Sequence, residues 1–169
     1  MKSYYQTIEV ATDQNNLLEL EPRLSDHVKD LDFFHVTDLT EDCKKWVSES
    51  GVKNGFVVLQ ALHTTCIISI NELDEPCLLG DINDKLRDSV PKQAPYLHNG
   101  PIRYKNLCSD DKKCDRNGDA HVKAFMYGVP SQTLIVREGK PEFGRWQRVC
   151  LIDFDGPRKR QVSVQVMGE

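Results

Sequence analysis

Apolar and polar residues alternate with a period of two near both ends of the chain. Residues 4–12 (YYQTIEVAT) alternate in this way, which predicts a half-buried strand. Toward the C-terminus the pattern predicts three more strands, joined by tight turns that contain glycine. These segments are 132–138 (QTLIVRE), 143–155 (FGRWQRVCLIDFD) and 161–167 (QVSVQVM).

Two further strand segments lie in the first half. Residues 33–36 (FFHV) are a short strand candidate. Residues 56–70 (FVVLQALHTTCIISI) are rich in β-branched residues but too long for one unbroken strand. They predict two strands, or one strand with a bulge near His63.

Helical spacing separates these strands. One stripe is formed by Leu39, Cys43, Trp46 and Val47, and we expect Asp38 and Glu41 to form a capping box and Gly51 to end the helix. A second stripe runs from Leu78 to Val90 and stops at Pro91. A third helix is expected over 119–128, with Asp119 at its start and Gly128 at its end.

Residues 91–118 show no hydrophobic periodicity and predict a long loop. Loops of this length in a compact domain usually have a functional role. Strands therefore group at both ends of the chain with helices between them. This order indicates an α+β fold built on mostly antiparallel sheet. Because neither a linker nor a repeat is visible, residues 1–169 are expected to form a single domain.

Composition narrows the class of protein. The chain has 39% hydrophobic and 28% charged residues, as ordinary globular proteins do, and its net charge of -4 argues against nucleic-acid binding. The basic cluster GPRKR at 156–160 is interpreted as a solvated turn. The N-terminal MKSYYQTIEV has no secretory h-region, and no apolar window is long enough for a membrane span. We therefore expect a cytoplasmic protein.

In that reducing compartment the six cysteines are expected to be thiols. Cys108 and Cys114 flank a polar segment, where they would suit a small disulfide loop or two metal ligands. Partners with standard zinc spacing are missing, so free loop thiols are favoured.

Three of the five histidines have unusual settings. His63 precedes two threonines, His98 lies in the long loop, and His121 falls in the first turn of a predicted helix. The positive end of the helix dipole disfavours a protonated His121, so this side chain should be neutral near pH 7. Three neutral histidines would suit a divalent metal, with Asp115 or Asp119 orienting one ring. Two would equally serve as acid and base around an anion held by Thr64 and Thr65. Simpler interpretations, such as solvated loop histidines, remain open at this point.

Four segments together resemble the YjbQ-like family, also described as the secondary thiamine-phosphate synthase family. The resemblance covers most of the chain and is carried by HTTCIISINE (63–72), YLH (96–98), DRNGDAHVKAFMYG (115–128) and GRWQRVCLIDFDGPRKRQVSVQVMG (144–168). It implies a two-sheet β-sandwich with a few helices, assembled as a trimer.

The resemblance also implies one polar pocket near a subunit boundary. Its residues here would be His63, Thr64, Thr65, Asn71, Glu72, His98, Asn117, Asp119 and His121, together with Trp146 and Gln147, and Arg145 stands where the family has threonine. The implied activity is a secondary thiamine-phosphate synthesis that expels pyrophosphate. Stabilising that leaving group calls for magnesium or for basic residues. The candidate basic residues are Lys123, Arg103 and Arg137.

The sequence thus predicts an enzyme that acts on a small phosphorylated metabolite. In this hypothesis His63, His98 and His121 are acid/base groups or ligands of Zn or Mg, Glu72 assists them, and no organic cofactor is needed. Two rival hypotheses stay open. One is a non-catalytic protein that senses a metabolite or a metal, and the other is a purely structural histidine cluster.

Overall fold

The computed structural model describes residues 1–12, 34–106 and 114–169. The strands are β1 (Lys2–Ala11), β2 (His35–Asp38), β3 (Gly55–Ala61), β4 (Cys66–Asn71), β5 (Ser131–Arg137), β6 (Lys140–Pro141), β7 (Arg148–Asp153) and β8 (Lys159–Gly168). The helices are α2 (Thr40–Ser50), α3 (Pro76–Ser89), the 3₁₀ turn η2 (Leu97–Asn99), α4 (Pro101–Asn106) and α5 (Gly118–Tyr127).

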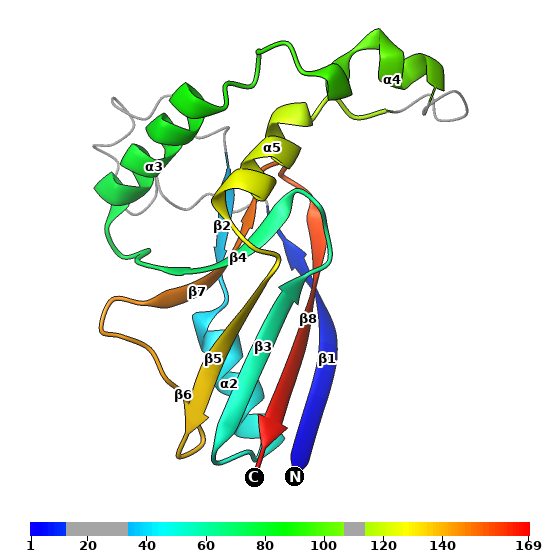
Figure 1. Ribbon diagram of the computed structural model, residues 1–169. Coiled ribbons are helices and arrows are strands. Elements are labelled where there is room, and N and C mark those ends of the chain that lie inside the picture. The colour runs from blue at the N-terminus through cyan, green and yellow to red at the C-terminus, as the bar shows by residue number, and fades with distance from the viewer. Residues whose placement is uncertain (13–33, 107–113) are drawn as a thin grey trace.

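The strands form two antiparallel sheets. One sheet has the order β1-β8-β3-β5-β6 and the other has the order β2-β7-β4. The long strands β1 and β8 pair from Lys2↔Gly168 to Ala11↔Lys159, which places the two termini side by side at one end of the molecule (Figure 1). The predicted α+β fold with mostly antiparallel sheets is confirmed.

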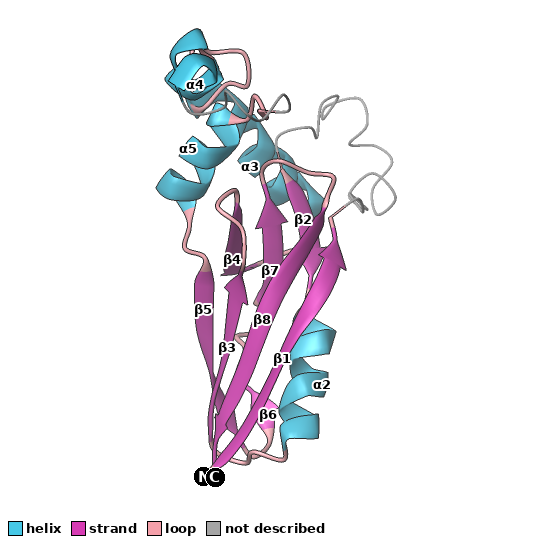
Figure 2. Ribbon diagram, turned by 90° about the vertical axis from the view of Figure 1, so that its right-hand side faces the viewer, coloured by secondary structure: helices cyan, strands magenta, loops and turns pink. Residues whose placement is uncertain are grey.

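The main core lies between the inner faces of the two sheets. Alternation along β8 buries Val162, Val164 and Val166 completely, and their counterparts include Val57, Leu59, Val149 and Leu151. Helix α2 closes one side of this core with Cys43, Trp46 and Val47, as its apolar stripe predicts (Figure 2). Burial of these side chains at about 1.5–3 kcal/mol each is the main stabilising contribution.

A second, smaller apolar cluster lies on the outer face of the three-stranded sheet. There Phe34, Ile67 and Phe154 pack against Leu86 of α3 and against Ala120 and Ala124 of α5. Helices α3, α4 and α5 therefore gather beyond one end of the sandwich, opposite the termini (Figure 1). This end carries His63, His98 and His121.

Most boundary predictions are confirmed, and the predicted capping box needs correction. Residues 56–70 form two strands, β3 and β4, separated by a turn at residues 62–65. The capping box is wrong, because Leu39 is the N-cap of α2 and Asp38 Oδ1 instead accepts a hydrogen bond from the Thr40 amide at 2.8 Å. Gly51 does end this helix in the left-handed conformation at φ 64°.

The long segment 91–118 is not entirely a loop, because it contains η2 and α4. The prediction of free loop thiols in this segment is wrong for Cys114, which is disulfide-bonded. Cys108 lies outside the described residues. The other described cysteines are thiols, as expected: Cys43, Cys66, Cys77 and Cys150.

Candidate functional site

The turn between β3 and β4 presents the first histidine. The backbone holds this turn from both sides, since Leu62 N–H donates to Gln161 O at 2.9 Å and Phe154 N–H donates to Thr65 O at 3.1 Å. As a result His63 and Thr64 are exposed whereas Thr65 is fully buried. Thr65 Oγ1 lies 2.9 Å from His63 Nδ1, and the Thr65 amide donates to the same nitrogen at 3.3 Å.

Behind Thr65 lies a buried ion pair. Arg160 Nε donates to Asp153 Oδ2 at 2.7 Å, and an Arg160 terminal nitrogen donates to Asp153 Oδ1 at 3.0 Å. That nitrogen also donates to Thr65 Oγ1 at 3.3 Å. Burial raises the pKa of Asp153, but the hydrogen bonds from Arg160 and the Asp155 amide outweigh it, and the net pKa is lowered. Asp153 is therefore ionised at neutral pH.

The second and third histidines come from η2 and the first turn of α5. The two segments pack closely, because a Cβ at Gly118 would lie 2.8 Å from Tyr96 Cβ, and the Gly118 amide donates to Asn99 Oδ1 at 3.0 Å. This contact brings the rings of His98 and His121 to a centroid distance of 4.7 Å. Two segments far apart from residue 63 in sequence thus supply a histidine pair.

An amide and a carboxylate hold His98. Asn117 Oδ1 lies 3.1 Å from His98 Nε2, and Asn117 Nδ2 donates to Asp155 Oδ2 at 3.0 Å. Arg158 Nε and an Arg160 terminal nitrogen lie 3.4 Å and 3.6 Å from the same carboxylate oxygen. Asp155 thereby links the His98 side of the site to the Arg160 side.

Two of the histidines have lowered pKa values. Partial burial of the ring lowers the pKa of His63 below 6.5. The positive charge of Arg160 lowers this pKa further, whereas the negative charges of Asp153 and Asp155 raise it. Burial also lowers the pKa of His121, followed by the charge of His98. The expected neutrality of His121 agrees with this direction, although the causes differ from the helix dipole we invoked.

A cleft of about 710 Å³ opens beside these residues. His63, Thr64 and His121 line it together with apolar side chains of the β3–β4 turn and α5, including Leu62, Ile67, Ala124 and Phe125. The rings of two predicted site histidines therefore face a space in the size range of ligand pockets.

Other predicted residues are engaged elsewhere. Lys123 and Asp119 form an ion pair of 2.8 Å with side chains 1% and 5% exposed, so neither charge faces the cleft. Asn71 is the last residue of β4, roughly 16 Å from Cys66 at the strand rise of about 3.3 Å per residue, and Glu72 follows it. Asn71 Oδ1 accepts from the Glu72 amide at 2.9 Å.

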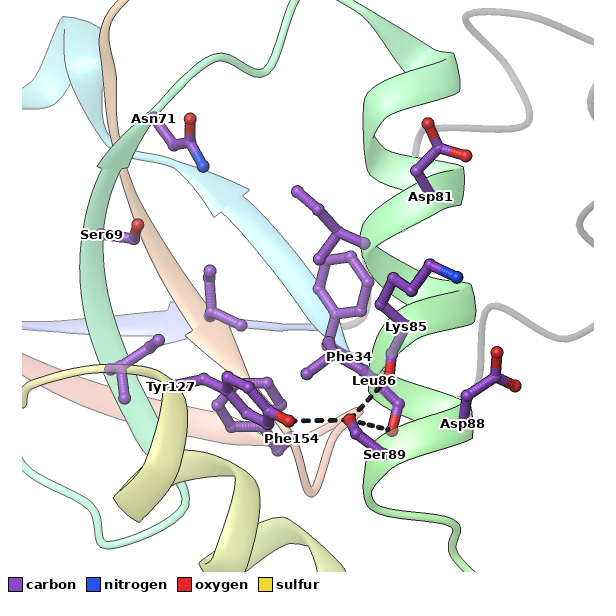
Figure 3. A pocket seen from close by; sticks show the side chains of 13 residues that line it. Phe34, Ser69, Asn71, Asp81, Lys85, Leu86, Asp88, Ser89, Tyr127 and Phe154 are labelled. Carbon is purple, nitrogen blue, oxygen red and sulfur yellow. Dashed lines mark hydrogen bonds between the residues drawn. The ribbon is translucent and has the colours of Figure 1, made fainter.

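Asn71 lines a separate cavity of about 640 Å³ between α3 and the outer face of the three-stranded sheet (Figure 3). The walls are mostly apolar, and Tyr127 Oη donates to Ser89 Oγ at 2.7 Å at one side. No histidine is among its described lining residues, which are Phe34, Ile67, Ser69, Asn71, Asp81, Ile82, Lys85, Leu86, Asp88, Ser89, Tyr127, Ile152 and Phe154.

Trp146 and Gln147 also lie away from the histidines, in the turn before β7. Trp146 is 54% exposed, and the Arg145 guanidinium lies over its ring, 4.7 Å from the ring centroid. Gln147 Oε1 accepts a hydrogen bond from the Gly144 amide at 2.7 Å. The Arg145 side chain thus stacks on the neighbouring Trp146 of the same turn.

Sequence reasoning missed Asp153, Asp155 and Arg160. The expectation of a solvated turn at 156–160 is wrong for Arg160, whose side chain is 5% exposed. A signal was present, because Arg160 shares the two-residue spacing of the buried valines of β8. A buried arginine needs a carboxylate, and the apolar run with acidic residues that lies nearest in sequence is LIDFD at 151–155.

Within the described ranges no group of three or more His, Cys, Asp or Glu side chains is arranged to hold a metal ion. No described helix is both long enough and apolar enough to cross a membrane.

Comparison with known proteins identifies relatives along most of the chain. Residues 27–169 match the family described as UPF0047 protein YjbQ-like. A UPF0047 protein of Methanocaldococcus jannaschii is 35% identical over 134 residues, which cover 79% of this chain and 86% of that protein. The UPF0047 protein YugU of Bacillus subtilis is 29% identical over 131 residues, or 78% of this chain and 88% of that protein.

Solved structures agree with these matches. A YbjQ-like protein of unknown function from Sulfolobus solfataricus has a TM-score of 0.73 at 28% identity and 99% coverage of both chains. A YjbQ/UPF0047 protein from Clostridium acetobutylicum has a TM-score of 0.71 at 31% identity, covering 96% of this chain and 99% of that one. The sequence resemblance and the fold lead to one conclusion: the chain belongs to the UPF0047 YjbQ-like family.

Proposed function

We propose that the chain is an enzyme that performs acid–base chemistry on a small phosphorylated metabolite bound over His63, His98 and His121. The observation that carries this proposal is that His63 and His121, from two separate segments and both with lowered pKa values, line one cleft, and that His98 from a third segment packs against His121. Perturbed titratable groups that line a cleft are the usual mark of a catalytic site.

The specific reaction that we propose is thiamine-phosphate synthesis, which the family resemblance implies. In this reaction the C–O bond of a pyrimidine methyl diphosphate breaks, a thiazole-phosphate nitrogen forms the new C–N bond, and pyrophosphate leaves. Side chains that remain exposed for contact with phosphate oxygens are Thr64 and Arg158. The buried Thr65 and Lys123 are not assigned that role.

The proposal assigns acid–base roles to the histidines, because no group of three or more His, Cys, Asp or Glu side chains in the described part of the chain is arranged to hold a metal ion. Nδ1 of His63 contacts Thr65, and Nε2 of His98 contacts Asn117. A divalent metal such as Mg therefore enters the proposal as the counter-ion of the diphosphate substrate, which such reactions commonly use.

We also propose self-association, in line with the trimer that the resemblance implies. Large apolar side chains are exposed on the outer face of the five-stranded sheet and on α5, including Ile135 at 55%, Phe125 at 90% and Met126 at 59%. Exposed apolar groups of this size often mark protein interfaces. A monomeric mass in light scattering would contradict this proposal.

The test of function is turnover by purified protein. Incubation with the pyrimidine diphosphate, the thiazole phosphate and Mg²⁺ should release pyrophosphate and thiamine phosphate in equal amounts. The variants His63→Ala and His121→Ala should lose this activity while keeping wild-type circular dichroism and mass. Saturable binding of both substrates without any product would instead support a non-catalytic binding protein and contradict the proposal.

A further inference from the structure

The orientation of the Asn117 amide determines which nitrogen of His98 carries hydrogen. Nδ2 of Asn117 faces Asp155 Oδ2 at 3.0 Å, and an ionised carboxylate can only accept hydrogen bonds. Asn117 Oδ1 therefore faces His98 and can only accept from Nε2 at 3.1 Å. The reversed amide would place two acceptors against each other at Asp155. His98 thus carries hydrogen on Nε2.

In a neutral His98 ring, Nδ1 must then hold a lone pair. Within the described part of the chain Nδ1 has no hydrogen-bond partner, and it is not among the fully buried unpartnered atoms. The ring contacts His121, which lines the cleft. His98 therefore offers an acceptor to any hydrogen that reaches Nδ1.

His63 has the opposite arrangement. The Thr65 backbone N–H is a donor in every protonation state, and it points at His63 Nδ1 at 3.3 Å. Thr65 Oγ1 accepts from Arg160 at 3.3 Å, and its own hydrogen has His63 Nδ1 at 2.9 Å as the nearer of two acceptors, with Asp153 Oδ1 at 3.5 Å. Nδ1 of His63 is therefore an acceptor, and the neutral ring keeps its hydrogen on Nε2.

We propose that Thr65 and Asn117 are positioning residues that give the two histidines opposite polarity, with His63 Nε2–H as a donor and His98 Nδ1 as an acceptor. The substrate then carries a phosphate or carbonyl oxygen that accepts from His63 and a hydrogen on oxygen or nitrogen that His98 receives. This inference rests on the proposed function for its substrate, but the tautomers themselves are a property of the free protein. It also separates the roles of two histidines that their residue type leaves equivalent.

The experiment is long-range ¹⁵N–¹H correlation NMR on ¹⁵N-histidine-labelled protein without substrate, near pH 7.5. We expect Nδ1 of both His63 and His98 to show the shift of an unprotonated nitrogen and Nε2 of both to show that of a protonated one. A protonated Nδ1 in either ring of the wild-type protein would overturn the inference. This measurement needs no variant and no activity.

Variants then test the positioning roles. Thr65→Val removes the hydroxyl that faces Nδ1, so a fraction of His63 should move to the Nδ1–H tautomer and kcat should fall about 10- to 100-fold with little change in KM. Thr65→Ser should restore both the tautomer of His63 and kcat. The matched control Thr64→Val should leave the tautomer of His63 unchanged. An unchanged tautomer in Thr65→Val would overturn the positioning role. Correct tautomers with no turnover in the wild type would refute the proposed function alone.

Discussion

Arg160 holds the Asp153 carboxylate through two hydrogen bonds of 2.7 and 3.0 Å, with side chains that are 5% and 0% exposed. A buried charge of either sign is costly once its partner is removed, since water cannot replace the lost contact. The pair therefore constrains how the β7–β8 turn folds under the histidine cluster. It is the structural base of the candidate site.

Removing Arg160 should destabilise the protein strongly. Arg160→Leu leaves Asp153 uncompensated, and the free energy of unfolding should fall by about 3–5 kcal/mol. The neighbouring Lys159→Leu is the matched control, because Lys159 pairs with Glu9 at the exposed surface, where solvent screening leaves such a pair little effect on stability. Urea denaturation of both variants measures the difference. Equal losses would show that burial of Arg160 does not matter.

The Lys123–Asp119 pair should behave as a structural element of α5. Lys123→Met should lower stability, again by roughly 3–5 kcal/mol, because it leaves a buried carboxylate. The double variant Lys123→Met/Asp119→Leu should recover most of that loss. KM in the double variant should match the wild type, since neither charge faces the cleft. A large rise in KM with restored stability would instead assign Lys123 to substrate binding.

Stability should decrease below pH 6.5. The folded pKa values of His63 and His121 lie below the ordinary 6.5, so between 6.5 and the folded pKa values the unfolded chain binds more protons than the folded one. The lowered pKa of Asp153 acts in the same direction, but only below its ordinary value of 3.8. Thermal melts from pH 8 to pH 5 should show this loss, and it should be smaller in His63→Gln. A higher stability at pH 5 than at pH 7 would contradict these shifts.

Thiol reactivity should distinguish the exposed cysteine from the buried ones. Burial raises the pKa of Cys43, Cys66 and Cys150 to about 12, so these thiols stay protonated and covered at pH 8. Cys77 is exposed at the start of α3. Iodoacetamide followed by peptide mass spectrometry should therefore modify Cys77 but none of the three buried thiols in native protein. Rapid labelling of Cys43 would indicate that the inter-sheet core opens.

Periodicity predicts most of the fold because the buried faces follow one spacing per element. The valines of β8 and the stripe of α2 fall where a period of two and a period of 3.6 place them. Local signals were less reliable at the ends of helices. Asp38, for example, accepts a hydrogen bond from the Thr40 amide of α2 although it lies one residue before the N-cap. The helical turns η2 and α4 lack any apolar stripe, so residues 91–106 read as a loop.

The site was harder to predict, because side-chain partners depend on which segments meet. The motif suggested one pocket for His63 and Asn71, yet an extended strand separates them within the chain. Thr65 looked like an anion contact next to Thr64, but alternate residues of the turn face opposite directions, and Thr65 faces Arg160. The role of Asp155 follows only from its contact with Asn117, which is 38 residues away.

The most direct test of the central claim compares the kcat for thiamine-phosphate formation in the wild type, His98→Ala and the remote exposed control Lys44→Ala. If His98 Nδ1 accepts a hydrogen bond from the substrate, His98→Ala should lose at least about 100-fold in kcat, and Lys44→Ala should retain the wild-type rate. A His98→Ala protein that is folded, assembled as the wild type is, and equally fast would contradict the account.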